Sequence, residues 1–443
     1  MRPLPGALLL ATLLTVTAVL TGAAVSAQPR TPAYIGLGEA RSLASALPPA
    51  SRPADLPAAA ATDAATRWRG WVSSHDQAIR RRLADGDEDT VLNWLLLGRT
   101  FTALPPASSA DLARARIDPF ILALEASGTD ERRRFARRHL ERRGLRFGGT
   151  AADRDRARAY LLRALEEMLA APAARAAAGA RQSSAAPASA FDQRGLSLDT
   201  SLQPNFAIEQ SLQAAKARGT VAAGAFRRIG IIGAGLDFAD KNSGFDFYPV
   251  QTVQPFALLD TLQRLGLAAA GTVEIVALDS PRVLEHVRAA RASRNYVIQL
   301  PLAETAPWSL EFRRYWATVG TQVGSAVAAN GPAGVAQRAV RVAPAALATL
   351  GAEDLNIIVQ RQAGASFDLV VATNVLVYYA PFEQAMAMAN IAAMLGPRGL
   401  FLTNTTLPAV PAAGLARAGS QVTLYTTDGR GDEIIWYRRA GQP

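Results

Sequence analysis

Apolar residues follow two different patterns along the chain, and the pattern changes near residue 200. Between residues 67 and 170 the apolar positions have helical spacing, as at Trp68, Val72 and Ile79, and further helices are expected at 91–97, 109–126, 129–143 and 151–170. From residue 201 onward, short apolar runs alternate with helical stretches, which is typical of an α/β sheet. We therefore expect an all-α domain over 67–170 and an α/β domain over 201–443.

The α/β region contains six apolar runs that predict strands, at 229–232, 273–278, 296–299, 355–359, 369–372 and 400–403. Helices are expected at 255–265, 281–292 and 382–394. Near the carboxyl end, 421–425 and 433–437 flank Asp428-Gly429-Arg430-Gly431, a sequence that favours a β-turn. The predicted fold is Rossmann-like, with a mostly parallel sheet, a C-terminal antiparallel hairpin and a preceding all-α domain.

The amino-terminal residues 1–27 have the form of a secretory signal. An apolar stretch from Leu8 to Leu20 precedes Val25-Ser26-Ala27, a small-x-small sequence that a signal peptidase cleaves. We expect an exported protein, periplasmic or secreted; the alternative is an uncleaved helix that anchors the chain in a membrane. Residues 28–66 and 171–200 are rich in Ala, Pro, Ser and Arg, and they are predicted to be linkers.

The composition of the chain excludes several kinds of functional site. The 443 residues carry a net charge of +10, almost all of it on Arg, and no cysteine, which excludes disulfides and thiolate sites. The three histidines lie far apart in sequence, so no metal centre is expected. No nucleic-acid partner is expected either. The Arg-rich stretch 131–143 is interpreted as a solvated helix face, and contact of the Arg132–Arg143 helix with an anionic membrane surface is the alternative.

Three strand ends carry the candidate chemistry. The run Ile229–Ile232 ends at Gly233-Ala234-Gly235, where missing side chains allow a tight turn and close approach of a ligand to the backbone. Asp279 follows the next predicted strand and can accept ribose hydroxyls, or it can cap the helix that Pro281 begins. Asn374, Tyr378 and Tyr379 follow the strand Phe367–Ala372, and the two tyrosines suit either substrate contact or packing.

The glycine loop, the strand-end Asp279 and the segment from Phe367 follow one another in the order found in class I S-adenosylmethionine-dependent methyltransferases. Residues 225–443, about half the chain, therefore resemble that family. The segment Phe367–Tyr379 is similar to its counterpart in chemotaxis-receptor methyltransferases. The resemblance implies S-adenosylmethionine as cofactor and methyl transfer to an unknown acceptor, with Asn374 and Tyr378 positioning the substrate. It implies a cofactor site made of Gly233, Ala234, Gly235, Asp237, Asp279, Ser280 and Asp368.

The chain departs from that family in several places. Asp237 stands where the third glycine of the loop is usual, and Asp279 lies about twice as far from the loop as the roughly 20 residues usual for a ribose carboxylate. The extra residues 240–251 are expected to form a lid, with Asp240 and Tyr248 near the ligand, or a surface loop held by its own aromatic residues. A further inserted helix with core aromatics is expected around Trp308–Trp316.

Two other functions also fit the sequence. Export separates the chain from the cytoplasm, where the cofactor is made, and favours a non-catalytic binding protein on a methyltransferase-like fold. The glycine loop also suits an NAD(P)-dependent oxidoreductase, although Phe238, at the position of the last glycine of that motif, would crowd the close helix packing.

Overall fold

The structure is a computed structural model that describes residues 32–58, 63–126, 128, 130–177, 200–240, 245–269, 271–302, 307–329, 336–364 and 366–441. The predicted signal at 1–27 and most of the predicted linker at 171–200 lie outside these ranges. Residues 31–443 form one compact unit, so the helical part and the α/β part are not separate bodies. Within the described ranges, no helix combines the length and apolarity needed to cross a membrane.

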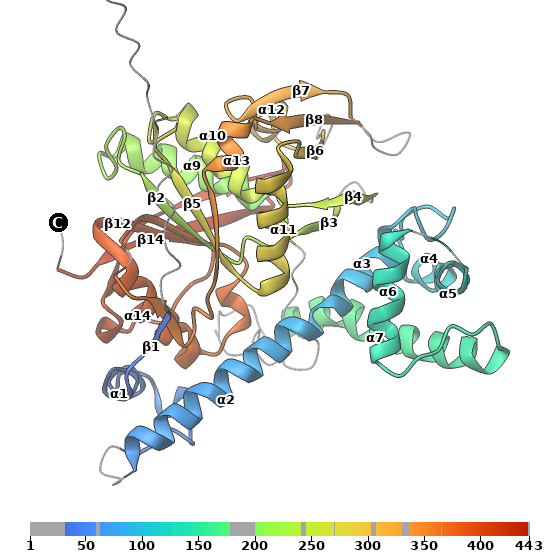
Figure 1. Cartoon of the computed structure of the whole chain (residues 1–443), viewed down its shortest axis with the longest axis horizontal. Coiled ribbons are helices and arrows are strands. Elements are labelled where there is room, and N and C mark those ends of the chain that lie inside the picture. The colour runs from blue at the N-terminus through green and yellow to red at the C-terminus, as the bar shows by residue number, and fades with distance from the viewer. Residues whose placement is uncertain are drawn as a thin grey trace, which may run out of the picture. The chain divides into compact units, whose positions relative to one another are not determined.

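A seven-stranded sheet forms the centre of the α/β part (Figure 1). In chain order its strands are β2 (Arg228–Ile232), β5 (Glu274–Asp279), β9 (Leu350–Asp354), β11 (Phe367–Ala372), β12 (Leu395–Thr403), β13 (Leu415–Leu424) and β14 (Gly431–Arg439). They are arranged in the order β13-β14-β12-β11-β2-β5-β9. All neighbours from β12 to β9 are parallel, whereas β14 is antiparallel to both β12 and β13. This confirms the Rossmann-like sheet with an antiparallel C-terminal hairpin.

Two of the expected strands are placed differently. The run 355–359 is not a strand: β9 ends at Asp354, and the buried Ile357, Ile358 and Val359 belong to the turn before β10 (Gln360–Gln362). The expected strand at 296–299 exists as β6 (Val297–Pro301), but it lies outside the main sheet. It pairs with β8 (Gln337–Val342), which also pairs with β7 (Gly324–Val327). Both runs are apolar because they are buried, but an apolar run does not indicate which element covers it.

Helices cover both faces of the main sheet because successive side chains of each strand point to opposite sides. Ile231, Ala277 and Val371 share one core. The helices on that side are α9 (Pro204–Ala217), α10 (Gln254–Arg264), α11 (Pro281–Ser293), α12 (Leu310–Thr318) and α13 (Pro344–Ala348). The neighbouring Ile232 and Leu278 belong to the other core. It is closed by α1 (Leu37–Ala46), α2 (Ala64–Asp85) and α14 (Pro381–Met394).

The amino-terminal segment predicted as a linker is folded over residues 32–58, so that prediction is wrong there. β1 (Pro32–Tyr34) pairs antiparallel with β10, and α1 and the short η1 helix (Pro49–Ser51) follow. The indole of Trp68 in α2 donates a hydrogen bond to the carbonyl of Ile35 over 3.0 Å. Its other partners, β10 and α14, lie more than 300 residues away in sequence, so composition alone predicts a linker.

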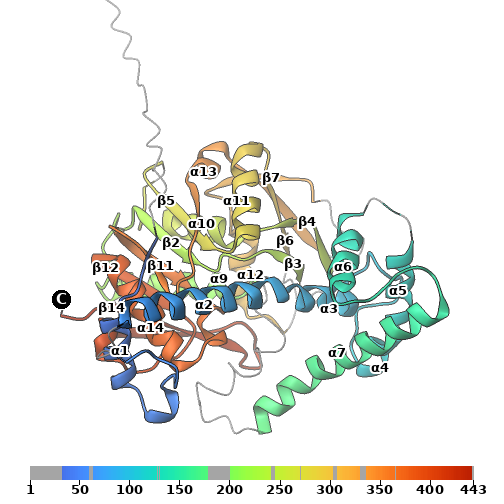
Figure 2. The ribbon, with the colours of Figure 1, turned by 60° about the horizontal axis from the view of Figure 1, so that its bottom comes forward.

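Helix α2 runs in both views as a long bar from α1 and α14 toward α3 (Figures 1 and 2). Beyond it lie α3 (Asp87–Leu97), α4 (Ala110–Ala115), α5 (Ile117–Glu125), α6 (Glu131–Arg142) and α7 (Ala151–Ala177). The single helix expected at 109–126 is divided into α4 and α5, and α7 continues to Ala177, into the stretch predicted as a linker. Trp94 of α3 packs edge-on against Phe238, with ring centroids 5.6 Å apart. Arg282 of α11 pairs with Asp87 and lies over the Phe135 ring at 4.1 Å, so the helical part is docked onto the α/β part.

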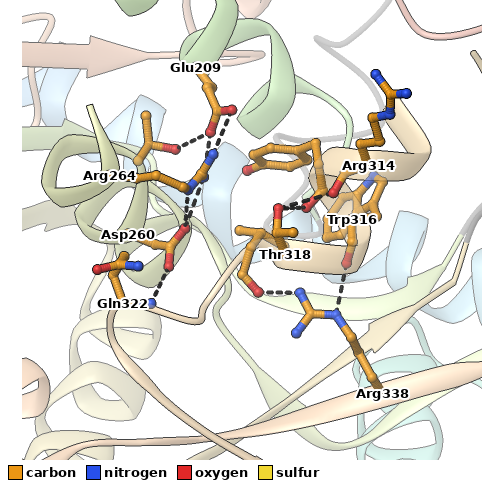
Figure 3. A network of polar contacts seen from close by, with 11 residues as sticks. Glu209, Asp260, Arg264, Arg314, Trp316, Thr318, Gln322 and Arg338 are labelled. Atoms are coloured by element: carbon orange, nitrogen blue, oxygen red, sulfur yellow. Dashed lines mark hydrogen bonds and ion pairs between the residues drawn. The ribbon is translucent and has the colours of Figure 1, made fainter. Parts of the chain in front are cut away.

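A buried polar network holds the insertion that contains α12 (Figure 3). Arg264 of α10 pairs with Glu209 and Asp260, and the fully buried Asp260 also accepts the amide hydrogen of Gln322 over 2.8 Å. Arg338 of β8 donates to the carbonyl of Trp316 over 2.8 Å. As expected, Phe312, Tyr315 and Trp316 are core residues.

Candidate functional site

The candidate site lies where the connections from the central strand β2 change direction. The chain first adds β5 and β9 on one side of β2, and later adds β11 and β12 on the other. In open parallel sheets such a switch point forms a crevice at the carboxyl ends of the strands, where ligands bind. Here the crevice is bordered by the loop after β2, by Asp279 at the end of β5, and by the loop after β11.

The loop after β2 turns on two glycines. Gly233 has φ +68° and Gly235 has φ +62°, conformations that residues with a side chain rarely adopt. The loop leads into β3 (Asp237–Asp240), which pairs with β4 (Phe245–Gln251), and α10 begins only at Gln254. The insertion is therefore a hairpin. The side chains of Asp240 and Tyr248 lie outside the described part, and their lid role remains a prediction.

Asp279 is bonded to this loop. Its Oδ2 accepts the amide hydrogen of Gly235 over 3.0 Å, and its Oδ1 accepts that of Ser280 over 2.6 Å. Burial raises the pKa of the Asp279 carboxyl, and the backbone amides of Gly235 and Ser280 oppose that rise. The Gly235 amide therefore donates its hydrogen bond to the Asp279 carboxylate, although the resemblance assigns these two groups to different parts of a ligand. A carboxylate has about four lone-pair sites, so it can still accept hydroxyl groups in an open crevice.

Helix α2 closes the crevice over this corner. Ile79, Arg80 and Leu83 line a cavity together with Gly233, Asp279, Ser280, Asp354, Val375 and Tyr379. The cavity has a volume of about 60 Å³, whereas pockets for drug-sized ligands measure roughly 300–1,000 Å³. The space does not admit a ligand of that size while α2 lies there. That α2 belongs to the site could not be predicted from its residues, because its apolar spacing fits any packed helix.

Val375 closes the corner from the other side. A Cβ added to Gly233 would lie 2.3 Å from Val375 Cγ2, so the loop after β11 sits directly on the glycine. The neighbouring Asn374 has the left-handed φ of +57°. Its amide and side chain form two hydrogen bonds with the Asn404 side chain, of 2.8 and 2.7 Å, which fix the loop at the ends of β11 and β12.

Asn374 faces a second cavity of about 330 Å³, within the range of ligand pockets. This cavity lies between the start of α9 and the turn of the β13–β14 hairpin, and its other lining residues include Trp308, Tyr425, Arg430 and Asp432. The Tyr425 hydroxyl donates to Asp432 Oδ2 over 2.6 Å, which leaves an indole, a guanidinium and a carboxylate around one space. None of Trp308, Tyr425, Arg430 and Asp432 was identified as a site residue from the sequence.

The two residues expected to position a substrate lie on different sides of this loop. Asn374 lines the larger cavity, whereas the Tyr378 carbonyl accepts a hydrogen bond from Arg82 Nη2 of α2 over 2.9 Å. The Arg82 guanidinium also lies 5.7 Å from the ring centroid of the buried Tyr379. Burial raises the pKa of the Tyr379 hydroxyl. The tyrosine pair therefore packs against α2, and Asn374 alone of these residues lines the larger cavity.

Two predicted cofactor residues are structural. Asp368 lies at the amino end of β11, and its carboxylate accepts the amide hydrogens of Arg227 and Arg228 over 2.8 and 2.9 Å. It is therefore at the opposite edge of the sheet from the glycine loop. Asp237 is buried and accepts the amide hydrogen of Val253 over 2.8 Å and the hydroxyl of Thr200, so it fixes the start of α10.

The Arg-rich helix α6 has a clear inner face, as the solvated-face interpretation expects. Ala136, His139 and Leu140 are buried. Several of its arginines are paired, Arg132 with Asp130 and Arg137 with Glu141 among them. No group of three or more potential metal ligands is found in the described ranges.

Comparisons with known proteins give structural similarity alone. No protein-family model and no curated protein matches the chain. Among solved structures, it is similar to a TehB-like SAM-dependent methyltransferase from Corynebacterium glutamicum, with 12% identity, 52% of this chain and 94% of that one covered, and a TM-score of 0.25. It is also similar to the N-methyltransferase NodS from Bradyrhizobium japonicum in complex with S-adenosyl-L-homocysteine, with 14% identity, coverage of 55% and 90%, and a TM-score of 0.28. The function is therefore inferred from the geometry of this chain.

Proposed function

We propose that the chain is a class I S-adenosylmethionine-dependent methyltransferase whose donor site is the corner formed by Gly233, Gly235 and Asp279. The observation that supports this most is the convergence of two left-handed glycines and a strand-end carboxylate at the switch point of a parallel sheet. Small residues there let a ligand approach the backbone, and the carboxylate supplies acceptors for its hydroxyls.

The acceptor side of the proposed site is the larger cavity beside Asn374. The loop after β11 separates the two spaces, since Val375 lines the small cavity and Asn374 the large one. An indole face with a carboxylate and a guanidinium suits a small polar acceptor that carries charge. The chain's contribution there would be orientation and exclusion of water.

The chain is proposed to be exported by the signal at residues 1–27 and to act in the periplasm or outside the cell. An export-dependent reporter, such as alkaline phosphatase, fused after residue 40 tests this, and activity of the reporter is expected only if the amino terminus directs it across the membrane. Release of a shortened fusion distinguishes a cleaved signal from an uncleaved anchor.

A second candidate is a non-catalytic binding protein on the same fold. Its specific support is the closed corner, where about 60 Å³ remain and the loop amide is bonded to Asp279. The dinucleotide alternative loses support because no helix starts at the glycine loop. A pyrophosphate is held at such a helix amino terminus, whereas this loop continues into β3.

Calorimetric titration of the full chain with S-adenosylhomocysteine and with NAD, each up to millimolar concentration, tests the proposal. Heat with S-adenosylhomocysteine that disappears in Asp279→Ala is expected. Asp368→Asn is the matched control, because that carboxylate lies at the other edge of the sheet, and it should retain the affinity of the wild type. Absence of heat with both ligands supports the non-catalytic alternative, and heat with NAD alone supports the oxidoreductase.

A further inference from the structure

We propose that α2 is a plug, in which the turn carrying Ile79, Arg80 and Leu83 occupies the adenosyl site and must be released before a ligand enters. The inference rests on the proposed function, because it takes the corner of Gly233 and Asp279 as the ligand site. It adds that this chain regulates access to that site with its own amino-terminal helix.

The plug fills the corner with apolar side chains. Ile79 is 2% exposed, and Leu83 packs beside it against the same core. Together with Ile232 and Leu278, at the ends of β2 and β5, they line the remaining space of about 60 Å³. Since that space is several times smaller than a ligand pocket, the helix and the ligand cannot occupy the corner together.

Polar contacts of the same turn reach the strand-end loops on both sides of the corner. On the β9 side, Arg80 Nη1 donates to both carboxylate oxygens of Asp354, over 2.9 and 3.2 Å. Asp76, one turn earlier, accepts from Asn356 Nδ2 over 2.8 Å. On the β11 side, Arg82 donates to the Tyr378 carbonyl over 2.9 Å. The helix therefore bridges the crevice and is held at both of its rims.

The Arg80–Asp354 ion pair of this turn is more exposed than the Trp68 hydrogen bond near the start of α2. The side chains of Arg80 and Asp354 are 33% and 44% exposed, so water screens their ion pair. By contrast, Trp68 near the start of the helix is buried and bonded to the Ile35 carbonyl. Trp71 stacks on both Trp68 and His75, and His75 contacts Glu383 over 3.1 Å. The start of α2 is thus fixed in the fold, and α3 after it is docked, so the turn over the corner between them is the part that we expect to move.

The absence of cysteine allows a direct test. In the full-length double variant Arg80→Cys with Asp354→Cys, the ion pair is removed and the two new thiols are the only ones in the chain. A short bis-maleimide then joins α2 to the end of β9. The probe is S-adenosylhomocysteine, and its affinity is measured by calorimetry before and after cross-linking.

Before cross-linking, the double variant should bind the probe about two- to fivefold more tightly than the wild type, because a larger fraction of molecules is open. After cross-linking, affinity should fall at least tenfold below that of the same variant un-linked. Arg67→Gln is the control. It removes the exposed ion pair with Asp63 at the other end of the same helix, and it should leave affinity unchanged.

The outcomes separate the plug from the proposed function. Equal affinity with and without the cross-link overturns the plug and leaves the donor site standing. If neither the wild type nor the double variant, with or without the cross-link, binds the probe, both proposals are overturned. In hydrogen exchange, residues 79–85 should lose protection when the probe saturates the wild type, and unchanged protection at saturation also counts against the plug.

Discussion

Replacement of Gly233 by Ala tests whether the corner is closed as the structure shows. Gly233 has φ +68°, and a Cβ at this position would lie 2.3 Å from Cγ2 of Val375. Two independent costs therefore arise. The methyl group strains the left-handed backbone, and it also collides with the loop after β11.

The magnitudes follow from these two terms. A residue with a side chain in the left-handed region costs about 1–2 kcal/mol. Forcing an extra methyl into a packed site adds about 1–3 kcal/mol. Gly233→Ala is therefore expected to lower the free energy of unfolding by about 2–5 kcal/mol. In a Val375→Ala background the collision is removed, and only the backbone term of about 1–2 kcal/mol should remain.

Urea unfolding of the wild type, both single variants and the double variant measures the coupling between the two positions. We expect an interaction energy of about 1–3 kcal/mol, within the range for residues in contact. Gly266→Ala is the matched control. It has nearly the same φ, +63°, but the nearest atom to its new Cβ is 4.0 Å away.

If Gly233→Ala costs no more than Gly266→Ala, or if Val375→Ala fails to relieve it, Val375 does not lie on the glycine. The corner would then be open in solution, and the reasoning that α2 and Val375 exclude the ligand would be refuted.

Three further predictions concern stability. Burial, with help from Arg142, lowers the pKa of His139 from 6.5 to about 4, so between those pH values the unfolded chain binds a proton that the folded chain does not. Stability should fall by about 2–3 kcal/mol between pH 7 and 4.5, and urea midpoints of His139→Gln should lose this part of the pH dependence. Asp260→Ala removes the buried carboxylate that pairs with the partly buried Arg264 and accepts the Gln322 amide hydrogen, and it should cost about 1–3 kcal/mol in denaturant unfolding, whereas Asp63→Ala, at an exposed pair, should leave the urea midpoint nearly unchanged. Asp130 accepts the amide hydrogens of Arg132 and Arg133 at the start of α6, so Asp130→Ala should lower the thermal midpoint through a loss of about 1 kcal/mol.

The centre of the sheet could be predicted because buried parallel strands form continuous apolar runs, as in Ile229–Ile232 and Leu369–Ala372. The edge strand β9, with the sequence Leu-Gly-Ala-Glu-Asp, does not have that pattern, because only its first residue is buried. The more apolar run 355–359 after it therefore predicts the strand instead. In fact it fills the space beneath α2 and α14.

The candidate site could be predicted only as far as it depends on strand ends. Gly233, Gly235 and Asp279 meet because the ends of neighbouring parallel strands share an edge. The roles of Asp237 and Asp368 could not be predicted, since a carboxylate next to a strand serves a ligand or a backbone amide equally well. The proposed role of α2 as a plug could not be predicted from the sequence. This helix precedes the sheet by about 150 residues, and its apolar positions do not indicate which surface they cover.

The closed corner also relates stability to binding. Ile79 and Leu83 shield Ile232 and Leu278 from water, and burial of an aliphatic side chain contributes about 1.5–3 kcal/mol. A ligand that enters must offset the loss of that contact, so the closed chain is more stable and binds more weakly than an open one. Thermodynamic reciprocity then fixes a relation between two measurements. The factor by which release of α2 tightens binding of S-adenosylhomocysteine must equal the factor by which bound S-adenosylhomocysteine favours release of α2. If the Arg80–Asp354 double variant gains affinity and the bound ligand also lowers protection in residues 79–85, one two-state movement of this helix accounts for both.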